Sequence, residues 1–127
     1  MPLNENLPII GITMGDPAGI GAEVIVKALA DPEIRQLGRF VVFGMNEAIT
    51  YAADMAELDI FWWRDQHEHL RPYEHRVVVV DYDEYNLPST NVQGPSKLGG
   101  QISWQFLHDA CDAIKRHMIH ALVTGPI

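Results

Sequence analysis

Four consecutive valines at residues 77–80, followed by Asp81, constrain the fold more than any other feature of the sequence. A strand with one face in water alternates polar and apolar residues, whereas this run is apolar on both faces. It is therefore predicted to be a central strand of a parallel sheet with helices covering both sides. Because parallel neighbours need crossover connections, the rest of the chain should alternate between strands and helices.

The remaining sequence fits that alternation. Further short strands are predicted at residues 8–13, 40–43, 60–63 and 121–124. Helices are predicted at residues 22–37 with a break at Asp31-Pro32, at residues 46–58 with Asn46 as N-cap, and at residues 99–117. Residues 64–75 are predicted to form a surface loop or edge hairpin, and residues 82–96 to be irregular. We therefore expect one α/β domain over residues 1–127, with a mostly parallel sheet and right-handed crossovers.

Helical periodicity predicts which side chains face the sheet. In the first helix these are Val24, Ile25, Ala28 and Leu29, and in the last helix Ile102, Phe106, Ala110, Ala113 and Ile114. Cys111 is predicted to pack within the last helix, because no neighbouring residue suggests an activated thiolate. Of the adjacent Trp62 and Trp63, one should face inward and one outward, where it would mark an interface.

Charge and cysteine content exclude several classes of partner. The net charge of -8, from 17 acidic and 9 basic residues, argues against a nucleic acid or an anionic membrane. A small phosphorylated ligand stays compatible, since backbone N–H groups can hold a phosphate. The single cysteine rules out an intramolecular disulfide and fits a reducing compartment. With no signal peptide or membrane span evident, a cytoplasmic location is expected.

The strongest local motif is residues 11–23, where the first predicted strand gives way to a helix. Ligands of open α/β sheets bind at such strand ends. Three glycines, at positions 15, 19 and 21, would let the backbone approach an anion closely. The spacing matches neither G-x-G-x-x-G nor a Walker A loop. Two interpretations stay open: a ligand-binding loop, or a strand-to-helix turn into which the glycines merely fit, with Asp16-Pro17 as its first two residues.

The residues predicted to lie near substrate or cofactor share one position, the carboxyl end of a strand or the helix start that follows it. They are Gly15, Asp16, Gly19, Gly21, Glu23 and Thr124. Glu23 has the simpler alternative of favouring the helix dipole from the first turn. No catalytic residue and no metal ligand is assigned.

Other polar residues are weighed and set aside. His67, His69 and His75 could form a metal cluster, since residues two apart on a strand face the same way. A solvated polar loop is the favoured interpretation. Asp81 and Asp83 could touch a ligand, but the end of a soluble strand explains them as well.

Three segments together resemble one known family. Residues 12–23 (ITMGDPAGIGAE) closely resemble the N-terminal signature of the 4-hydroxythreonine-4-phosphate dehydrogenases and their four-carbon sugar-acid phosphate relatives. Residues 94–101 (GPSKLGGQ) resemble that family's glycine-rich entry to a long helix, and residues 121–127 (ALVTGPI) its following strand and turn. Ala22 departs mildly from the family, which generally has proline there.

The resemblance implies an incomplete isocitrate/isopropylmalate dehydrogenase-like fold, a homodimer, and the cofactors NAD and a divalent metal, usually zinc. The implied reaction is oxidation of 4-phosphooxy-L-threonine in pyridoxal phosphate biosynthesis. The alternatives are oxidation of 4-phospho-D-threonate or erythronate in sugar-acid breakdown, or a non-catalytic phosphate-binding or interaction module. In the family, the histidines that bind metal and the residues that bind substrate lie beyond the position of residue 127. The chain is thus expected to be an N-terminal portion without turnover, binding NAD or metal weakly or not at all.

Overall fold

The fold is a single parallel sheet, seen in a computed structural model that describes residues 6–68, 75–85 and 96–125. Its strand order is β3-β4-β2-β1-β5, and every neighbouring pair is parallel. The strands are β1 (Ile9–Thr13), β2 (Arg39–Gly44), β3 (Trp63–Gln66), β4 (Val77–Asp81) and β5 (Ala121–Thr124). The predicted α/β class with a parallel sheet is confirmed.

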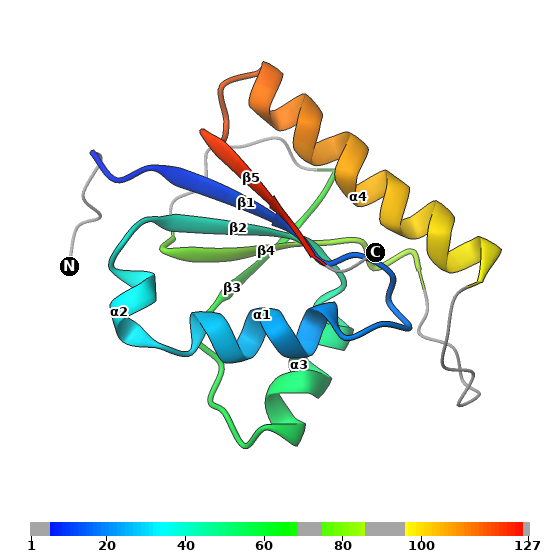
Figure 1. Cartoon of the computed structure of the whole chain (residues 1–127), viewed down its shortest axis with the longest axis horizontal. Helices are drawn as coiled ribbons and strands as arrows, with labels where there is room; N and C mark the ends of the chain where they lie inside the picture. Colours follow the sequence, from blue (N-terminus) through cyan, green and yellow to red (C-terminus); the bar gives the residue numbers. More distant parts are fainter. Residues whose placement is uncertain (1–5, 69–74, 86–95, 126–127) are drawn as a thin grey trace.

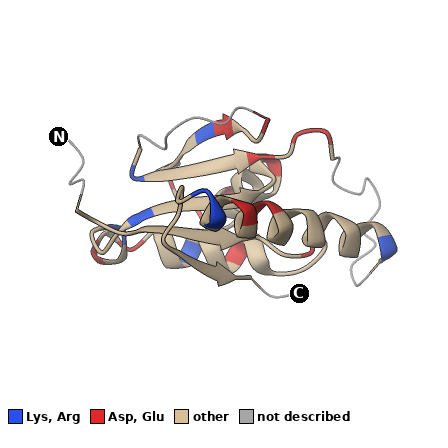
Figure 2. Cartoon of the chain, turned by 90° about the horizontal axis from the view of Figure 1, so that it is seen from above, with Lys and Arg blue, Asp and Glu red and all other residues tan. Residues whose placement is uncertain are grey.

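Helices cover both faces of this sheet. They are α1 (Gly21–Leu29), α2 (Pro32–Arg35), α3 (Asn46–Met55) and α4 (Lys97–Lys115). Figure 1 shows α4 crossing one face, while α1 and α3 lie together on the other. Lysine, arginine, aspartate and glutamate are interspersed over helices and strand ends in Figure 2. Within the part of the chain that is described, no helix is both long and apolar enough to cross a membrane.

The core is centred on β2 and β4. All five residues of β4 are buried, and Val78 is fully excluded from solvent. Phe40 pairs with Val77, so the two most apolar strands lie side by side. Burying apolar surface on both faces stabilises the fold by about 25 cal/mol for each Å² removed from water. The valine run is therefore an interior strand with a parallel neighbour on each side, as its composition predicts.

Two predicted helix faces need correction. Val24 is 47% exposed and Ala28 is also exposed, whereas Val26 is fully buried. Positions 24 and 26 point to nearly opposite sides of a helix, so only one valine could face the sheet. Packing against α3 within the core buries Val26, so the predicted inward positions of Val24 and Ala28 are wrong.

The last helix shows the same kind of correction at its rim. Ile114 is 36% exposed, and Cys111 is exposed rather than packed within the helix. Phe106 and Ala110 are completely buried, as expected, and Gly99 and Ser103 join them on the buried face. The buried stripe of α4 thus runs from Gly99 to Ala113, and Ile114 lies at its rim.

The third strand lies three residues later than predicted, at Trp63–Gln66, within the segment expected to be a loop or hairpin. Arg64 of this strand binds the Asp81 carboxylate of β4. A strand held by such polar contacts is not detected by a search for apolar runs. Trp62 is partly buried and Trp63 is 55% exposed, as the prediction of one inward and one outward side chain requires. Trp63 stacks on His75 with ring centroids 4.4 Å apart.

Of the helix signals named in the sequence, one is confirmed and one is corrected. The predicted break at Asp31-Pro32 is confirmed, because the Asp31 side chain accepts from the Glu33 amide and α2 begins at Pro32. Asn46 is not the N-cap of α3; Met45 occupies that position and provides no side-chain cap. The backbone N–H of Asn46 instead donates to Oδ1 of Asp81, 2.8 Å away.

Candidate functional site

The sheet topology defines one place where a ligand is expected. From β1 the chain passes through α1 to β2 on one side, whereas β5 lies on the other side of β1. The carboxyl ends of β1 and β5 therefore flank a topological switch point, where open α/β sheets bind their ligands. Residues 14–20 leave β1 at this point, and Gly125 follows β5. We name residues 14–21 with Thr124 and Gly125 the glycine corner.

Strand pairing brings the two halves of the predicted site together. Thr124 is the register partner of Thr13, the residue just before the glycine-rich segment. The Gly125 amide donates to the Thr13 carbonyl oxygen at 2.8 Å. Thr124 itself is exposed. Residues more than a hundred positions apart in sequence thus meet at one sheet edge.

The loop of the glycine corner is a tight turn. The Gly19 amide donates to the Asp16 carbonyl oxygen at 2.9 Å, with Pro17 in the second position, as predicted. The Asp16 carboxylate accepts from the Ala18 amide, also at 2.9 Å. Two backbone donors that could have faced an anion are therefore already used inside the turn.

Close packing around Met14 accounts for several of the glycines. Met14 is 1% exposed, and a Cβ at Gly21 or Gly125 would collide with its carbonyl oxygen. Gly15 has a φ of 82°, which favours glycine. The turn interpretation therefore accounts for glycine at positions 15, 21 and 125 without a ligand. Gly19 is exposed, as is the neighbouring Ile20.

Asp16 also touches the first turn of α4. A Cβ at Gly99 would collide with the Asp16 carboxylate, so glycine permits this close approach. Ser96 begins the helix by accepting from the Gly99 amide at 2.9 Å. Sequence reasoning did not single out Gly99 as a site residue, although it lies in the glycine-rich helix entry that resembles the family.

Glu23 lies in the first turn of α1 and pairs with Lys27 at 2.7 Å. Both side chains are more than half exposed, so this pair contributes at most about 1 kcal/mol. The helix-dipole alternative for Glu23 accounts for this geometry.

Asp81 joins three elements. It is 5% exposed and accepts from the Asn46 amide at 2.8 Å and from Nε of Arg64 at 2.6 Å. The hydrogen bond to Asp81 raises the pKa of Arg64, and its charge and that of Asp83 add to this effect against the lowering effect of burial. The structure thus gives Asp81 a role in linking β4, α3 and β3.

A separate cavity of about 230 Å³ lies between the residues that follow β3 and β4 and the second half of α4. Its lining includes His67, Glu68, Tyr82, Asp109, Asp112 and Arg116. Tyr82 is buried and donates its hydroxyl to Asp109 at 2.6 Å, and Gln105 donates to the same carboxylate. Burial alone would raise the pKa of Asp109, but hydrogen bonds from Tyr82, Gln105 and His108 outweigh it and lower that pKa.

The three histidines weighed as metal ligands have different surroundings. His67 lies beside Glu68 and Glu84, His75 stacks on Trp63, and His69 lies outside the described residues. Glu84 was not considered from the sequence, because it is distant from His67 along the chain and only the pairing of β3 with β4 brings them together.

Comparison with known proteins gives one consistent group of relatives. No protein-family model matches the chain. A protein of Oceanobacillus iheyensis described as a D-threonate 4-phosphate dehydrogenase is 32% identical over 94% of this chain. A 4-hydroxythreonine-4-phosphate dehydrogenase of Trichlorobacter lovleyi is 28% identical over 98% of it. The chain is a relative of these dehydrogenases. The resemblance seen in its sequence motifs is thereby confirmed.

Solved structures agree with this relationship. The crystal structure of a 4-hydroxythreonine-4-phosphate dehydrogenase from Burkholderia phymatum has a TM-score of 0.76 at 28% identity over 94% of the chain. A Salmonella typhimurium protein, 22% identical with a TM-score of 0.74, shares the fold. The chain spans 36% of the Oceanobacillus relative and 36% of the Burkholderia chain. The expectation that the family's metal- and substrate-binding residues lie beyond residue 127 stays a prediction.

Proposed function

We propose that the chain forms one wall of the active site of an NAD- and divalent-metal-dependent dehydrogenase that oxidises the hydroxyl group of a 4-phosphorylated hydroxy acid. The observation that carries this proposal is the glycine corner at the sheet's switch point, in a chain whose relatives are named as phosphorylated hydroxy-acid dehydrogenases. The favoured substrate is 4-phosphooxy-L-threonine, in pyridoxal phosphate biosynthesis. The second candidate is 4-phospho-D-threonate or erythronate, in keeping with the name of the Oceanobacillus relative.

The start of α1 is the part of the corner suited to an anion. Ile20 is the N-cap, is 60% exposed and provides no side-chain hydrogen bond to the first turn. The first amides of a helix point outward and carry partial positive charge, which favours a phosphate group. Gly19, exposed and without a side chain, leaves room for that approach. In our proposal these amides hold a phosphate of NAD or of the substrate, and NAD, when bound, accepts the hydride.

The proposed catalytic metal does not fit the corner. Among the described residues that form it, Asp16 is the one carboxylate and there is no imidazole. Asp16 is occupied by the Ala18 amide and by the first turn of α4. We therefore place that metal outside this chain and assign no catalytic step to the described residues. The homodimer and the cytoplasmic location are parts of the same proposal, supported by the family resemblance and by the single cysteine.

A titration of the 127-residue chain tests the local part of the proposal. Inorganic phosphate and NAD are added separately while backbone amide shifts are recorded. We expect shifts concentrated at residues 19–23. Ile20→Asp should abolish them, because a carboxylate beside the helix start repels an anion. Met55→Asp is the matched control, since Met55 is 70% exposed and this change adds the same charge elsewhere. Unchanged amides at residues 19–23 in the wild-type chain would exclude this binding site.

A chimera tests the enzymatic part. The matching segment of the Trichlorobacter lovleyi relative is replaced by this chain, and NAD reduction is measured with both candidate substrates. We expect activity in the chimera and at least about a tenfold lower kcat/KM when it carries Ile20→Asp, with Met55→Asp close to the parent. Shifts in the titration combined with an inactive, folded chimera would favour the non-catalytic binding module.

A further inference from the structure

Two carboxylates converge on one imidazole nitrogen at the carboxyl edge of the sheet. Nε2 of His67 lies 2.6 Å from Oε2 of Glu84 and 3.1 Å from Oε1 of Glu68. His67 and Glu68 follow β3, and Glu84 follows β4, so strand pairing creates the cluster. The cluster lies near the β3 edge of the sheet, whereas the glycine corner is built on β1 and β5 at the other edge.

This arrangement has more acceptors than one proton can satisfy. An imidazole nitrogen carries at most one hydrogen, so Nε2 can donate to only one of the two carboxylates at a time. The nearby guanidinium groups are engaged elsewhere: Arg64 binds Asp81 and Asp83, and Arg116 binds Asp112. Among the described residues, the ion-pair partner of Glu68 and Glu84 is His67 alone. A multivalent cation in place of the shared proton would satisfy all three groups together.

We propose that His67, Glu68 and Glu84 bind a divalent transition-metal ion, with Zn²⁺ the best match. One imidazole nitrogen with two carboxylate oxygens is a donor set that zinc accepts, whereas magnesium and calcium prefer oxygen alone. The three ligand atoms lie within 4.8 Å of one another. Bonds of about 2.0–2.2 Å in a tetrahedral site separate ligand atoms by roughly 3.3–3.6 Å. The glutamate side chains, 51% and 45% exposed, have the freedom to open to that spacing.

The imidazole is already held in place. The His67 side chain is 19% exposed, and its ring stacks on Tyr82 with centroids 3.9 Å apart and planes 10° from parallel. Tyr82 is in turn fixed by its hydrogen bond to Asp109. Orientation of a ligating histidine by its surroundings is a general feature of metal sites. His67 and Glu68 also line the cavity of about 230 Å³, which leaves room for water as a fourth ligand.

This site is independent of the dehydrogenase proposal. The family's catalytic metal is placed outside the chain, and the glycine corner contributes no residue to the cluster. The proposal departs from the expectation that the chain binds divalent metal weakly or not at all. That expectation followed from the family's metal ligands, which lie beyond residue 127. The separate weighing of a local metal cluster considered only histidines, and Glu84 enters through the tertiary structure.

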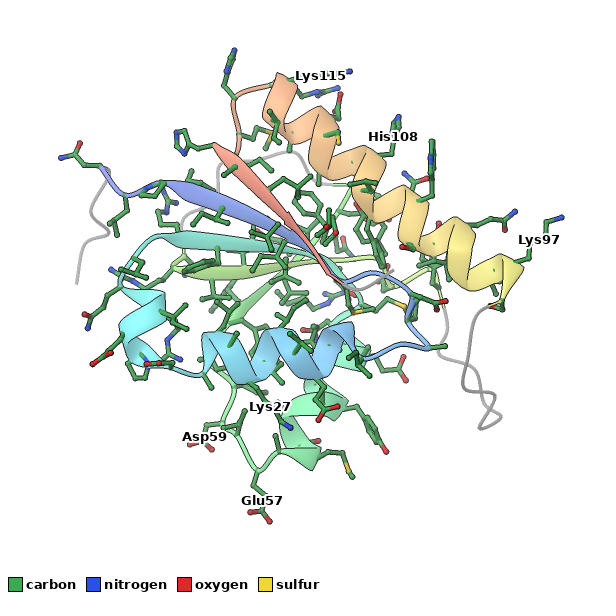
Figure 3. The ribbon with its side chains drawn as sticks, viewed as in Figure 1. Lys27, Glu57, Asp59, Lys97, His108 and Lys115 are labelled. Atoms are coloured by element: carbon green, nitrogen blue, oxygen red, sulfur yellow. The ribbon has the colours of Figure 1, made fainter. Side chains whose placement is uncertain are left out.

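Titration calorimetry with Zn²⁺ on the 127-residue chain tests the proposal. We expect one site, and affinity at least about tenfold weaker in His67→Gln and in Glu84→Gln. His108→Gln is the matched control. Unlike His67, His108 lies beside a single carboxylate, with Nδ1 3.3 Å from Oδ1 of Asp109. Figure 3 shows it on the outer side of α4. The control should bind Zn²⁺ like the wild type. Equal affinity in wild type and His67→Gln, or an equal loss in His108→Gln, would overturn the assignment.

A measurement on the unmutated protein removes any dependence on how the variants fold. The imidazole ring resonances of His67 are followed by NMR during the same titration. They should shift or broaden at the first equivalent of Zn²⁺, before those of His108 and His120. Early response of other histidines with His67 unaffected would contradict the proposal.

Discussion

At the scale of single residues, the glycine corner is decided by what surrounds Met14. Its side chain packs against Gly44, and its carbonyl oxygen blocks a Cβ at Gly21 and, together with that of Thr13, a Cβ at Gly125. Glycine at these positions is therefore a requirement of close packing, whatever ligand the exposed part of the loop binds. The sequence marks these glycines clearly but does not say which of them serve packing.

Gly21→Ala should lower the free energy of unfolding by about 2–3 kcal/mol, because the new methyl group has to displace main-chain atoms. Gly100→Ala is the matched control. No atom lies within 4 Å of a Cβ there, and the position is exposed within α4. Alanine at position 100 should stabilise the chain by about 0.5–1 kcal/mol through its helix propensity. Urea unfolding of both variants measures the contrast, and two changes of the same sign would contradict it.

At the scale of elements, polar contacts tie strands to helices where apolar packing ends. Asp81 of β4 holds the start of α3 and Arg64 of β3, and Tyr82, directly after β4, holds α4 through Asp109. The shift of β3 away from its predicted position has this cause, since a strand fixed by an arginine–aspartate pair leaves no apolar signature.

The Tyr82–Asp109 contact makes stability depend on pH. The pKa of Asp109 is lower in the folded chain than its ordinary value. Its contribution to stability is therefore complete above the ordinary carboxyl pKa of about 4 and is lost as pH falls through the lower folded pKa. Tyr82→Phe keeps the ring but removes the hydroxyl donor. It should raise the pKa of Asp109 and lower stability at pH 7 by about 1 kcal/mol.

Unfolding of Tyr82→Phe at several pH values, with NMR titration of the Asp109 carboxyl carbon, checks this expectation. The difference from wild type should shrink once the solution is acidic enough to protonate Asp109 in both folded proteins. Tyr51→Phe is the control, because Tyr51 is 63% exposed and its change should stay within about 0.5 kcal/mol. A stability difference that is constant with pH would show that the hydroxyl acts independently of Asp109.

At the scale of the whole molecule, burial is graded across the sheet. β4 is buried throughout and β2 almost so, whereas β5 has three exposed residues of four and lies at the sheet edge. Local opening is easiest where few apolar contacts hold the chain. We therefore expect the edge strand that carries Thr124 to open more easily than the interior strands.

Hydrogen exchange should reproduce this gradient. Amides of β2 and β4 should exchange slowest, close to the rate set by global unfolding, and those of β5 should exchange at least about tenfold faster. Native-state exchange followed by NMR at fixed pH and temperature measures the ranking. Protection in β5 equal to that in β4 would indicate that the edge strand is as firmly held as the centre.

Local patterns in the sequence determined most of the architecture. The valine run specified a central parallel strand, and the Asp31-Pro32 pair specified a helix break, because each acts through its immediate neighbours. The motifs of residues 12–23, 94–101 and 121–127 indicated a family resemblance that the similar proteins confirm. Strand pairing then brought Thr124 to the glycine corner and joined Glu84 to His67, and packing of α4 on the sheet placed Asp16 against Gly99. Such contacts depend on how strands and helices far apart in the sequence come together. The periodicity of one segment does not determine that arrangement.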